Sequence, residues 1–169
     1  FLMAGLIILF FFFLKDDLVI LTAGKKFGSQ ILVSLMIIIL MDIRIQSFGG
    51  VFGLQEFSYV PSVSFTVFVF VLLINAYNLI DGIDGLAGSV GLLSSLTFGV
   101  FFYIIGLSAP ALVAFALVGA LVPFIYYNFS GKKKIFMGDT GTMIVGFLLA
   151  YLCVSFISIN QNLSIPETL

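Results

Sequence analysis

The sequence predicts an all-α, polytopic transmembrane helix bundle. Of the 169 residues, 62% are hydrophobic and only 9% are charged, and long apolar runs reach the length that reads as membrane-spanning. At about 20 residues per span, the chain has room for roughly six helices joined by short loops. Backbone polar groups find no water in the hydrocarbon core, so helices are the expected spanning elements. We therefore expect residues 1–169 to form a single integral-membrane domain.

Six apolar runs are the predicted spans: residues 1–14, 31–41, 61–75, 86–107, 111–127 and 143–159. The first is short, and because the chain opens at Phe1 inside a hydrophobic run, we interpret it as the second part of a truncated span. Pro61 suits the start of the third span, and Pro123 predicts a kink in the fifth. Residues 160–169 are polar, and we expect the chain to be a fragment truncated at both ends.

Small residues mark both connections and a packing face. Residues 46–60 carry three glycines among aromatic residues, which is typical of a short extracytoplasmic hairpin or an interfacial loop. Residues 108–110 are expected to form a tight turn. In the fourth span, small residues recur on one face and permit close helix approach, so they are interpreted as packing positions rather than ligands. These positions are Gly88, Gly91, Ser95 and Gly99.

Polar residues gather where the third span ends, in the segment NAYNLIDGIDGLAG. Asn75, Asn78, Asp81 and Asp84 recur at every third residue. In a straight α-helix three residues turn by about 300°, so these groups would drift around the cylinder unless a 3₁₀ turn or a glycine break kept them convergent. An N-cap and turn is the alternative, but it explains one or two such residues rather than four. We expect a helix that ends or breaks here and gathers oxygen ligands.

Alternation of six spans places connections 15–30, 79–85 and 129–139 on one side of the membrane. Six of the seven basic residues lie in these connections, whereas Arg44 lies on the other side, and the positive-inside rule makes the lysine-rich side cytoplasmic. Five of the eight carboxylates are on that same side: Asp16, Asp17, Asp81, Asp84 and Asp139.

A cluster of acids repels itself unless lysines or a divalent cation balance it. Oxygen ligands favour Mg²⁺ or Mn²⁺, and Mg²⁺ pairs readily with substrate phosphates. For the adjacent pair Asp16 and Asp17, an ordinary solvated loop is the alternative. Histidine is absent and Cys153 is the only cysteine, which excludes a Ser/His/Asp triad and a cysteine-rich metal site within this chain.

Three segments, about a quarter of the chain, resemble the polyprenyl-phosphate N-acetylhexosamine-1-phosphate transferase family: DDLVILTAGKKFGSQ, NAYNLIDGIDGLAG and IFMGDTGTMIVGF. The family includes phospho-N-acetylmuramoyl-pentapeptide transferase, which more often has Thr at the position of Ile80. The resemblance therefore favours the bacterial undecaprenyl-phosphate N-acetylglucosamine-1-phosphate transferase type. It implies a Mg²⁺-dependent reaction (Mn²⁺ is the alternative) that joins a UDP-sugar to polyprenyl phosphate and releases UMP, as the first membrane step of cell-envelope polysaccharide synthesis.

The resemblance also implies roles for individual residues. The implied catalytic residues are Asp16, Asp17 and Lys26, with Lys26 binding phosphate. The implied metal ligands are Asn78 and Asp139. The implied substrate-binding residues are Asn75, Asp81, Gly82, Asp84 and Phe136, with Phe136 stacking on uracil.

The implied partners are a UDP-N-acetylhexosamine, undecaprenyl phosphate and the lipid bilayer of the bacterial inner membrane, with the active site facing the cytoplasm. Nucleic acid is not expected, and a homodimer is left open. The chain departs from the family at Ala23, where Pro is usual, and at Thr142, where Ser is usual. The family's histidine-bearing loop after the third motif is missing, so this fragment alone is expected to be inactive. A transporter and a non-catalytic membrane scaffold are the alternatives from other functional classes.

Overall fold

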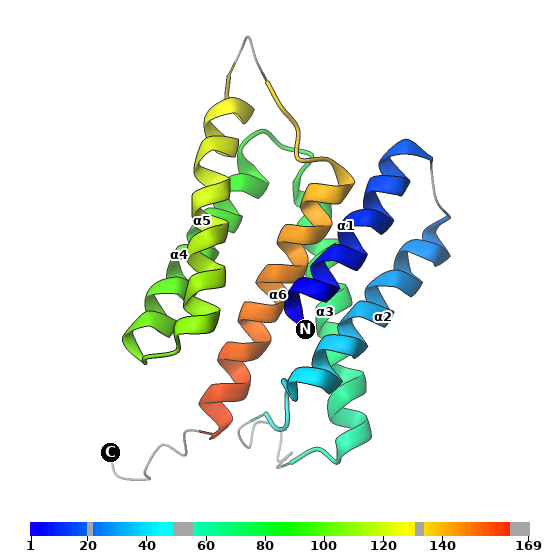
Figure 1. Ribbon diagram of the computed structural model, residues 1–169, viewed down its shortest axis with the longest axis vertical. Coiled ribbons are helices and arrows are strands. Elements are labelled where there is room, and N and C mark those ends of the chain that lie inside the picture. The colour runs from blue at the N-terminus through cyan, green and yellow to red at the C-terminus, as the bar shows by residue number, and fades with distance from the viewer. Residues whose placement is uncertain (20–21, 49–55, 131–133, 163–169) are drawn as a thin grey trace.

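The computed structural model describes residues 1–19, 22–48, 56–130 and 134–162, and these fold into α-helices that pack side by side (Figure 1). The helices are α1 (Leu2–Leu18), α2 (Ala23–Met41), α3 (Tyr59–Ile80), α4 (Leu86–Ile104), α5 (Ser108–Asn128) and α6 (Gly138–Asn162). Helices α2 to α6 are long and apolar enough to cross a membrane. Over the described ranges, extended structure is limited to one isolated antiparallel bridge between Ser47 and Glu56. The predicted all-α fold class is confirmed.

Helix α6 is the centre of the arrangement (Figure 1). It packs against α1, α3, α4 and α5, and 67% of its apolar stretch is buried, against 22% to 33% for the other candidate spans. Helices α4 and α5 form a pair on one side of α6, while α1, α2 and α3 lie on the other. The element that carries Asp139 at its start therefore contacts almost every other helix.

The predicted polar connection at residues 15–30 is wrong in extent. Helix α1 continues through Asp17 to Leu18, and α2 already begins at Ala23, so Lys26 and Gln30 are helical. Likewise α6 begins at Gly138, five residues before the predicted start of the last span. An apolar run marks the part of a helix that lies in the hydrocarbon core. The helix itself continues into the interface, because its backbone hydrogen bonds are internal and lysine side chains extend toward water.

The predicted tight turn at residues 108–110 is also wrong. Helix α5 begins at Ser108, and the chain turns at residues 105–107, where Gly106 has a φ of 79°. Pro110 therefore lies in the first helical turn, where its missing N–H removes no helical hydrogen bond. Pro123 lies inside α5, as predicted.

The described ends of the predicted hairpin lie side by side: Ser47 and Glu56 form the bridge, and the Phe57 N–H donates a 2.7 Å hydrogen bond to the Gln46 carbonyl. Phe48 packs edge-on against Phe57, with ring centroids 4.9 Å apart. Three glycines of this hairpin, Lys132, Lys133 and the end of the polar tail lie outside the described residues.

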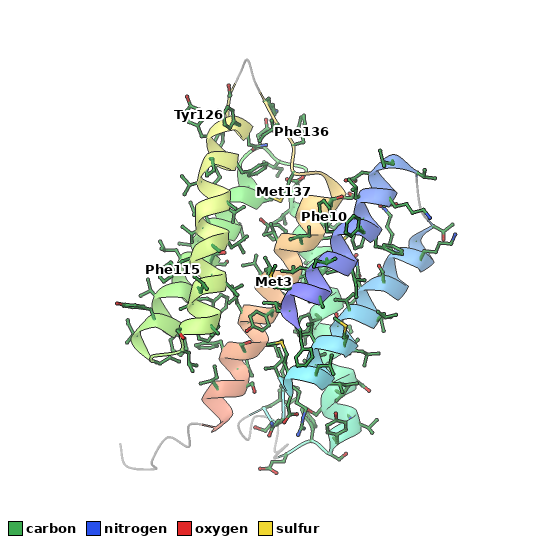
Figure 2. All side chains as sticks on the ribbon, viewed as in Figure 1. Met3, Phe10, Phe115, Tyr126, Phe136 and Met137 are labelled. Carbon is green, nitrogen blue, oxygen red and sulfur yellow. The ribbon has the colours of Figure 1, made fainter. Side chains whose placement is uncertain are left out.

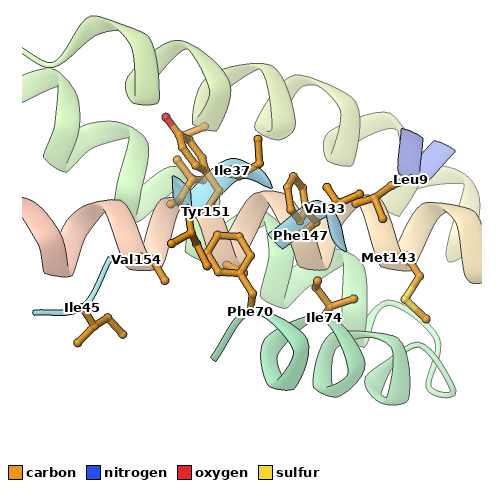
Figure 3. Close-up of a cluster of buried hydrophobic side chains, with 14 of the residues drawn as sticks. Leu9, Val33, Ile37, Ile45, Phe70, Ile74, Met143, Phe147, Tyr151 and Val154 are labelled. Atoms are coloured by element: carbon orange, nitrogen blue, oxygen red, sulfur yellow. The ribbon is translucent and has the colours of Figure 1, made fainter. Parts of the chain in front are cut away.

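The core of the bundle forms where α3 meets α6 (Figure 3). The rings of Phe70 and Phe147 are fully buried with centroids 5.6 Å apart, and Ile74 lies beside them. Between α4 and α5, the small residues are packing positions, as predicted. A Cβ added at Gly88 would lie 2.7 Å from the Ile125 side chain, and one at Gly99 would lie 3.0 Å from the ring of Phe115.

Gly146 allows the backbones of α3 and α6 to approach closely. A Cβ at this position would lie 3.0 Å from the Cα and 3.2 Å from the carbonyl oxygen of Ile74. Because these are backbone atoms, no rotamer change can relieve the contact. The close approach brings the end of α3 against the start of α6, where the polar residues lie.

We expect Gly146→Ala to lower the free energy of unfolding by about 1–3 kcal/mol, the usual range for overpacking. Thermal unfolding in detergent is the measurement. Gly119→Ala is the matched control, because a Cβ there meets nothing within 4 Å, and Ala favours helix over Gly by about 1 kcal/mol. Equal stability of the two variants would contradict the close approach.

Candidate active site

The polar residues singled out by the sequence meet at one end of the bundle, at the top in Figure 1. Helices α1, α3 and α5 end there, and α2, α4 and α6 begin there. Side-chain hydrogen bonds link α2 to α6, α3 to α6, and α1 to α6 across this end. The described residues of connections 15–30, 79–85 and 129–139 therefore lie at one end of the bundle, as their predicted grouping on one side requires.

Lys26 joins two carboxylates that come from different helices. Its ammonium Nζ lies 2.5 Å from Asp16 Oδ2 and 2.8 Å from Asp139 Oδ2. The Asp16 side chain is only 2% exposed, while that of Asp139 is 41% exposed. A buried carboxylate is tolerated only with a counter-charge. The Lys26 ammonium therefore neutralises Asp16, while the Asp139 side chain stays partly exposed at the surface.

Asn78 approaches Asp139 from α3. Its Nδ2 donates to Asp139 Oδ1 at 3.3 Å and to the Thr142 hydroxyl at 2.7 Å. Gly138 begins α6 with a φ of 68°, a conformation that favours glycine, and it places Asp139 in the first helical turn. Negative charge is favoured there by the helix dipole.

Asp17 has a different partner from its neighbour Asp16. The Thr140 hydroxyl donates to Asp17 Oδ2 at 2.5 Å, which fastens the end of α1 to the start of α6. The adjacent aspartates thus point to two separate places, one buried against a lysine and one at the surface.

A second group of contacts orders the turn between α3 and α4. Gly85 has a φ of 72°, and its N–H donates to the Asn128 side-chain oxygen at 2.6 Å. Asn128 in turn donates from Nδ2 to the Ile135 carbonyl at 2.8 Å. This single buried amide therefore fastens the turn to the segment that precedes α6.

Lys134 and Phe136 lie on that same segment, at the rim of the site. Lys134 Nζ is 2.6 Å from Asp84 Oδ2 and 5.0 Å from the centre of the Phe136 ring. The Phe136 side chain is 71% exposed and projects at the same end of the molecule as Tyr126 (Figure 2). An exposed aromatic face beside a cation can accept a planar ligand.

The four polar residues of the central stretch do not converge on one point. Asn75 and Asn78 are still helical, and the break comes at Asp81, whose N–H bonds to the Asn78 carbonyl three residues back. Asn78 contacts Asp139, whereas Asn75 pairs with Gln30 and Asp84 pairs with Lys134. The predicted helix end is confirmed, and Gly82 lies in the turn that follows it.

The oxygen donors fit a magnesium ion that keeps most of its own ligands. In the part of the chain that the structure describes, no three acidic or cysteine side chains are grouped as a metal site. Asp16 and Asp139 are nevertheless held around one cation, the Lys26 ammonium. Mg²⁺ is commonly bound by one or two carboxylates plus waters and phosphates. Turning the Asn78 amide over would also present its oxygen toward Asp139, since the two orientations have the same shape.

Four residues without a role in the sequence prediction contribute to this end: Gln30, Asn128, Thr140 and Thr142. The sequence signal that could have identified them is an amide or hydroxyl side chain at the margin of an apolar run. Such a group has few water partners and needs a protein partner.

Burial raises the pKa of Asp81, and the negative charge of Asp139 raises it further. Asp81 therefore holds its proton more tightly in the folded protein than in the unfolded chain. A carboxyl of this kind leaves stability unaffected below its unfolded pKa of about 3.9, and it lowers stability as the pH rises through its folded pKa.

We expect Asp81→Asn to raise the thermal midpoint at pH ~7, because it should increase the free energy of unfolding by no more than about 1 kcal/mol. At pH ~3 the midpoint should be unchanged. Thermal unfolding in detergent across this pH range is the measurement. Asp84→Asn is the control, because it removes the contact with Lys134 and should not stabilise. A difference for Asp81→Asn that grows toward acid pH would contradict the raised pKa.

Comparisons with known proteins match nearly the whole chain. The model of glycosyl transferase family 4 matches residues 1–157. The chain is 30% identical over 141 residues to undecaprenyl-phosphate alpha-N-acetylglucosaminyl 1-phosphate transferase of Escherichia coli O157:H7, covering 81% of this chain and 38% of that protein. It is 35% identical over 147 residues to decaprenyl-phosphate N-acetylglucosaminephosphotransferase of Mycolicibacterium smegmatis, covering 79% and 35%.

A third relative is phospho-N-acetylmuramoyl-pentapeptide-transferase of Helicobacter pylori, 31% identical over 159 residues, covering 78% of this chain and 42% of that protein. The chain thus spans about two fifths of the length of these curated relatives. The family match extends over far more than half of the chain, and it includes every helix that brings a side chain to the site. The chain belongs to glycosyl transferase family 4.

Proposed function

We propose that the full-length protein transfers N-acetylglucosamine 1-phosphate from a UDP-sugar to polyprenyl phosphate and releases UMP, as the first membrane step of cell-envelope polysaccharide synthesis. The observation that carries this proposal is the Lys26 ammonium held between Asp16 and Asp139 beside Asn78. The names of the relatives from Escherichia coli and Mycolicibacterium smegmatis support N-acetylglucosamine as the sugar.

The reaction joins two anions, so positioning and charge neutralisation are its main requirements. An oxygen of the lipid phosphate attacks the β-phosphorus of the UDP-sugar, and the bond from that phosphorus to the UMP oxygen breaks. In the proposed site, the Lys26 ammonium attracts phosphate. A phosphate monoester is already largely ionised at about pH 7, so Asp16 and Asp17 act by orienting their partners rather than by removing a proton.

Asp139 and Asn78 are the residues that would hold Mg²⁺, with Mn²⁺ as an alternative hard cation. When bound, the ion supplies positive charge to the diphosphate and stabilises the charge that develops on its oxygens. Asp139 suits this role because one carboxylate oxygen contacts Lys26 and the other faces Asn78, at a surface where its side chain is 41% exposed.

The nucleotide is proposed to bind at the turn after α3. Asp81, Gly82 and Asp84 supply its polar edge, and the exposed Phe136 ring supplies a face for uracil. Lys134 contacts both Asp84 and the Phe136 ring, so uracil would replace the ammonium on that ring. Stacking of a base on an aromatic ring contributes about 1–3 kcal/mol.

Transfer of phospho-N-acetylmuramoyl-pentapeptide is the second candidate function. The Helicobacter pylori relative carries that name and is 31% identical to this chain. The two candidates differ in the sugar and share the proposed site for UDP and Mg²⁺.

The full-length protein is expected to exchange labelled UMP into UDP-N-acetylglucosamine, and only when Mg²⁺ and polyprenyl phosphate are both present. Removing Mg²⁺ with a chelator should abolish exchange, and adding Mg²⁺ should restore it. Scintillation counting of the separated nucleotides is the measurement. Exchange with UDP-N-acetylmuramoyl-pentapeptide but not with UDP-N-acetylglucosamine would assign the second candidate function instead.

Within the same assay, Asp139→Asn should lower the rate by at least about 10²-fold, because it removes the charge proposed to hold the ion. Asp42→Asn is the matched control. Asp42 is at the opposite end of the bundle, 76% exposed, with a φ of 49° that Asn adopts readily. A near-normal rate for Asp139→Asn at limiting Mg²⁺ would exclude Asp139 as a metal ligand.

The site end of the bundle is proposed to face the cytoplasm of a bacterial inner membrane. In a Cys153→Ala background, an impermeant maleimide added to intact cells should label Glu56→Cys but not Lys25→Cys. Lys25→Cys should react once the membrane is permeabilised, because both positions are exposed. The reverse pattern would invert the orientation and place the site on the wrong side for a cytoplasmic nucleotide sugar.

A further inference from the structure

Two amide side chains pair directly below the polar cluster of Lys26, Asn78 and Asp139. Asn75 Nδ2 donates to Gln30 Oε1 at 2.7 Å, and Gln30 Nε2 donates back to Asn75 Oδ1 at 3.4 Å. Gln30 is 1% exposed, and its Nε2 also lies 3.3 Å from Met143 Sδ. The amide pair therefore contacts α2, α3 and α6, which are the helices that supply the cluster.

These residues are about one helical turn apart on each of the three helices. Gln30 follows Lys26 by four residues on α2, and Met143 follows Asp139 by four residues on α6. On α3, Asn75 precedes Asn78 by three residues. Residues three or four apart share a helix face one turn from each other. Each member of the cluster thus lies one turn away from a member of the amide contact.

Both donor hydrogens of Asn75 are used inside the protein. One is directed to Gln30 Oε1 and the other to the Val71 carbonyl, 2.7 Å away, and a carboxamide has only two such hydrogens. Its oxygen faces the Gln30 amide. Asn75 therefore has no donor left for a nucleotide sugar, in contrast to the substrate-binding role that the family resemblance implies.

Hydrogen-bonded amides inside a membrane bundle allow few alternative registers. A slip of α2 against α3 would leave both carboxamides without partners, and unsatisfied polar groups are costly where water is absent. Apolar side chains of similar size would pack in several registers at similar energy. The polar pair thus selects one axial position of α2 against α3, as a single buried Asn does in a coiled coil.

We propose that Gln30 and Asn75 are positioning residues, which set the register of α2 and α3 so that Lys26 and Asn78 meet the two carboxylate oxygens of Asp139. In this role Asn75 acts through Gln30 and not by touching the substrate. The effect on catalysis rests on the proposed transferase function, whereas the effect on the distance between Lys26 and Asp139 does not.

A zero-length carbodiimide cross-link tests the distance without any turnover. In the full-length wild-type protein, Lys26 and Asp139 should be joined, because their side chains are 2.8 Å apart. The Lys134 and Asp84 side chains, 2.6 Å apart, provide an internal standard, and mass spectrometry of the peptides gives the ratio. The double variant Gln30→Leu with Asn75→Leu should lower this ratio at least threefold. An unchanged ratio would overturn the proposal.

Kinetics on the same variants separates positioning from stability and from substrate contact. The double variant leaves no buried amide unpaired, so its thermal midpoint should be close to wild type, while kcat should fall at least tenfold and KM for UDP-N-acetylglucosamine should change less than twofold. The exchanged pair Gln30→Asn with Asn75→Gln keeps the reciprocal bonds and should recover kcat to within about threefold of wild type.

Three kinetic outcomes would also overturn the positioning role. These are a normal kcat in the double variant, a raised KM with normal kcat in Asn75→Leu, and no recovery in the exchanged pair. Thr97→Val is the control, because Thr97 is exposed on α4 and its hydroxyl donates to the Leu93 carbonyl of its own helix. If the wild-type protein shows no exchange activity, the proposed function fails, and the cross-link ratio still decides the register.

Discussion

The contact of one ammonium with two carboxylates is the interaction on which the polar end of this protein depends. Asp16 is almost completely buried, and an unpaired charge in such a place would destabilise the fold by several kcal/mol. Lys26 neutralises it from α2 and meets Asp139 of α6 with the same nitrogen. Because the three residues belong to three helices, neutralising the buried acid also fixes the positions of the helix ends.

Close packing and a few internal polar bonds hold the helices in that arrangement. In a bilayer the lipid tails are as apolar as the side chains, so helix association depends on packing and hydrogen bonds rather than on exclusion of water. Gly146 admits the backbone of α3, the pair Gln30 and Asn75 links α2 to α3, and the charged cluster completes the end. Helix α6 contacts most of the bundle for this reason.

Much of the fold follows from local patterns and the bilayer. Spans, the break after Ile80 and the small packing residues of α4 all depend on hydropathy, on glycine and on helical period, which are local properties. The sequence prediction places the starts of α2 and α6 too late, because it follows the apolar runs. Those runs mark the hydrocarbon core, whereas a helix extends as far as its backbone hydrogen bonds continue. The grouping of Asp16, Lys26 and Asp139 at one end also followed from the alternation of spans.

The amino-acid order alone was enough for the all-α class, for the grouping of acids and lysines at one end of the bundle, and for the three segments that resemble the family. Only the tertiary structure decided the partners: Lys26 between two acids, Asp84 with Lys134, and Asn75 with Gln30. Helical period sets the direction of a side chain relative to its own axis. Its partner depends on the rotation and height of a neighbouring helix, which only the packing of distant parts of the chain determines.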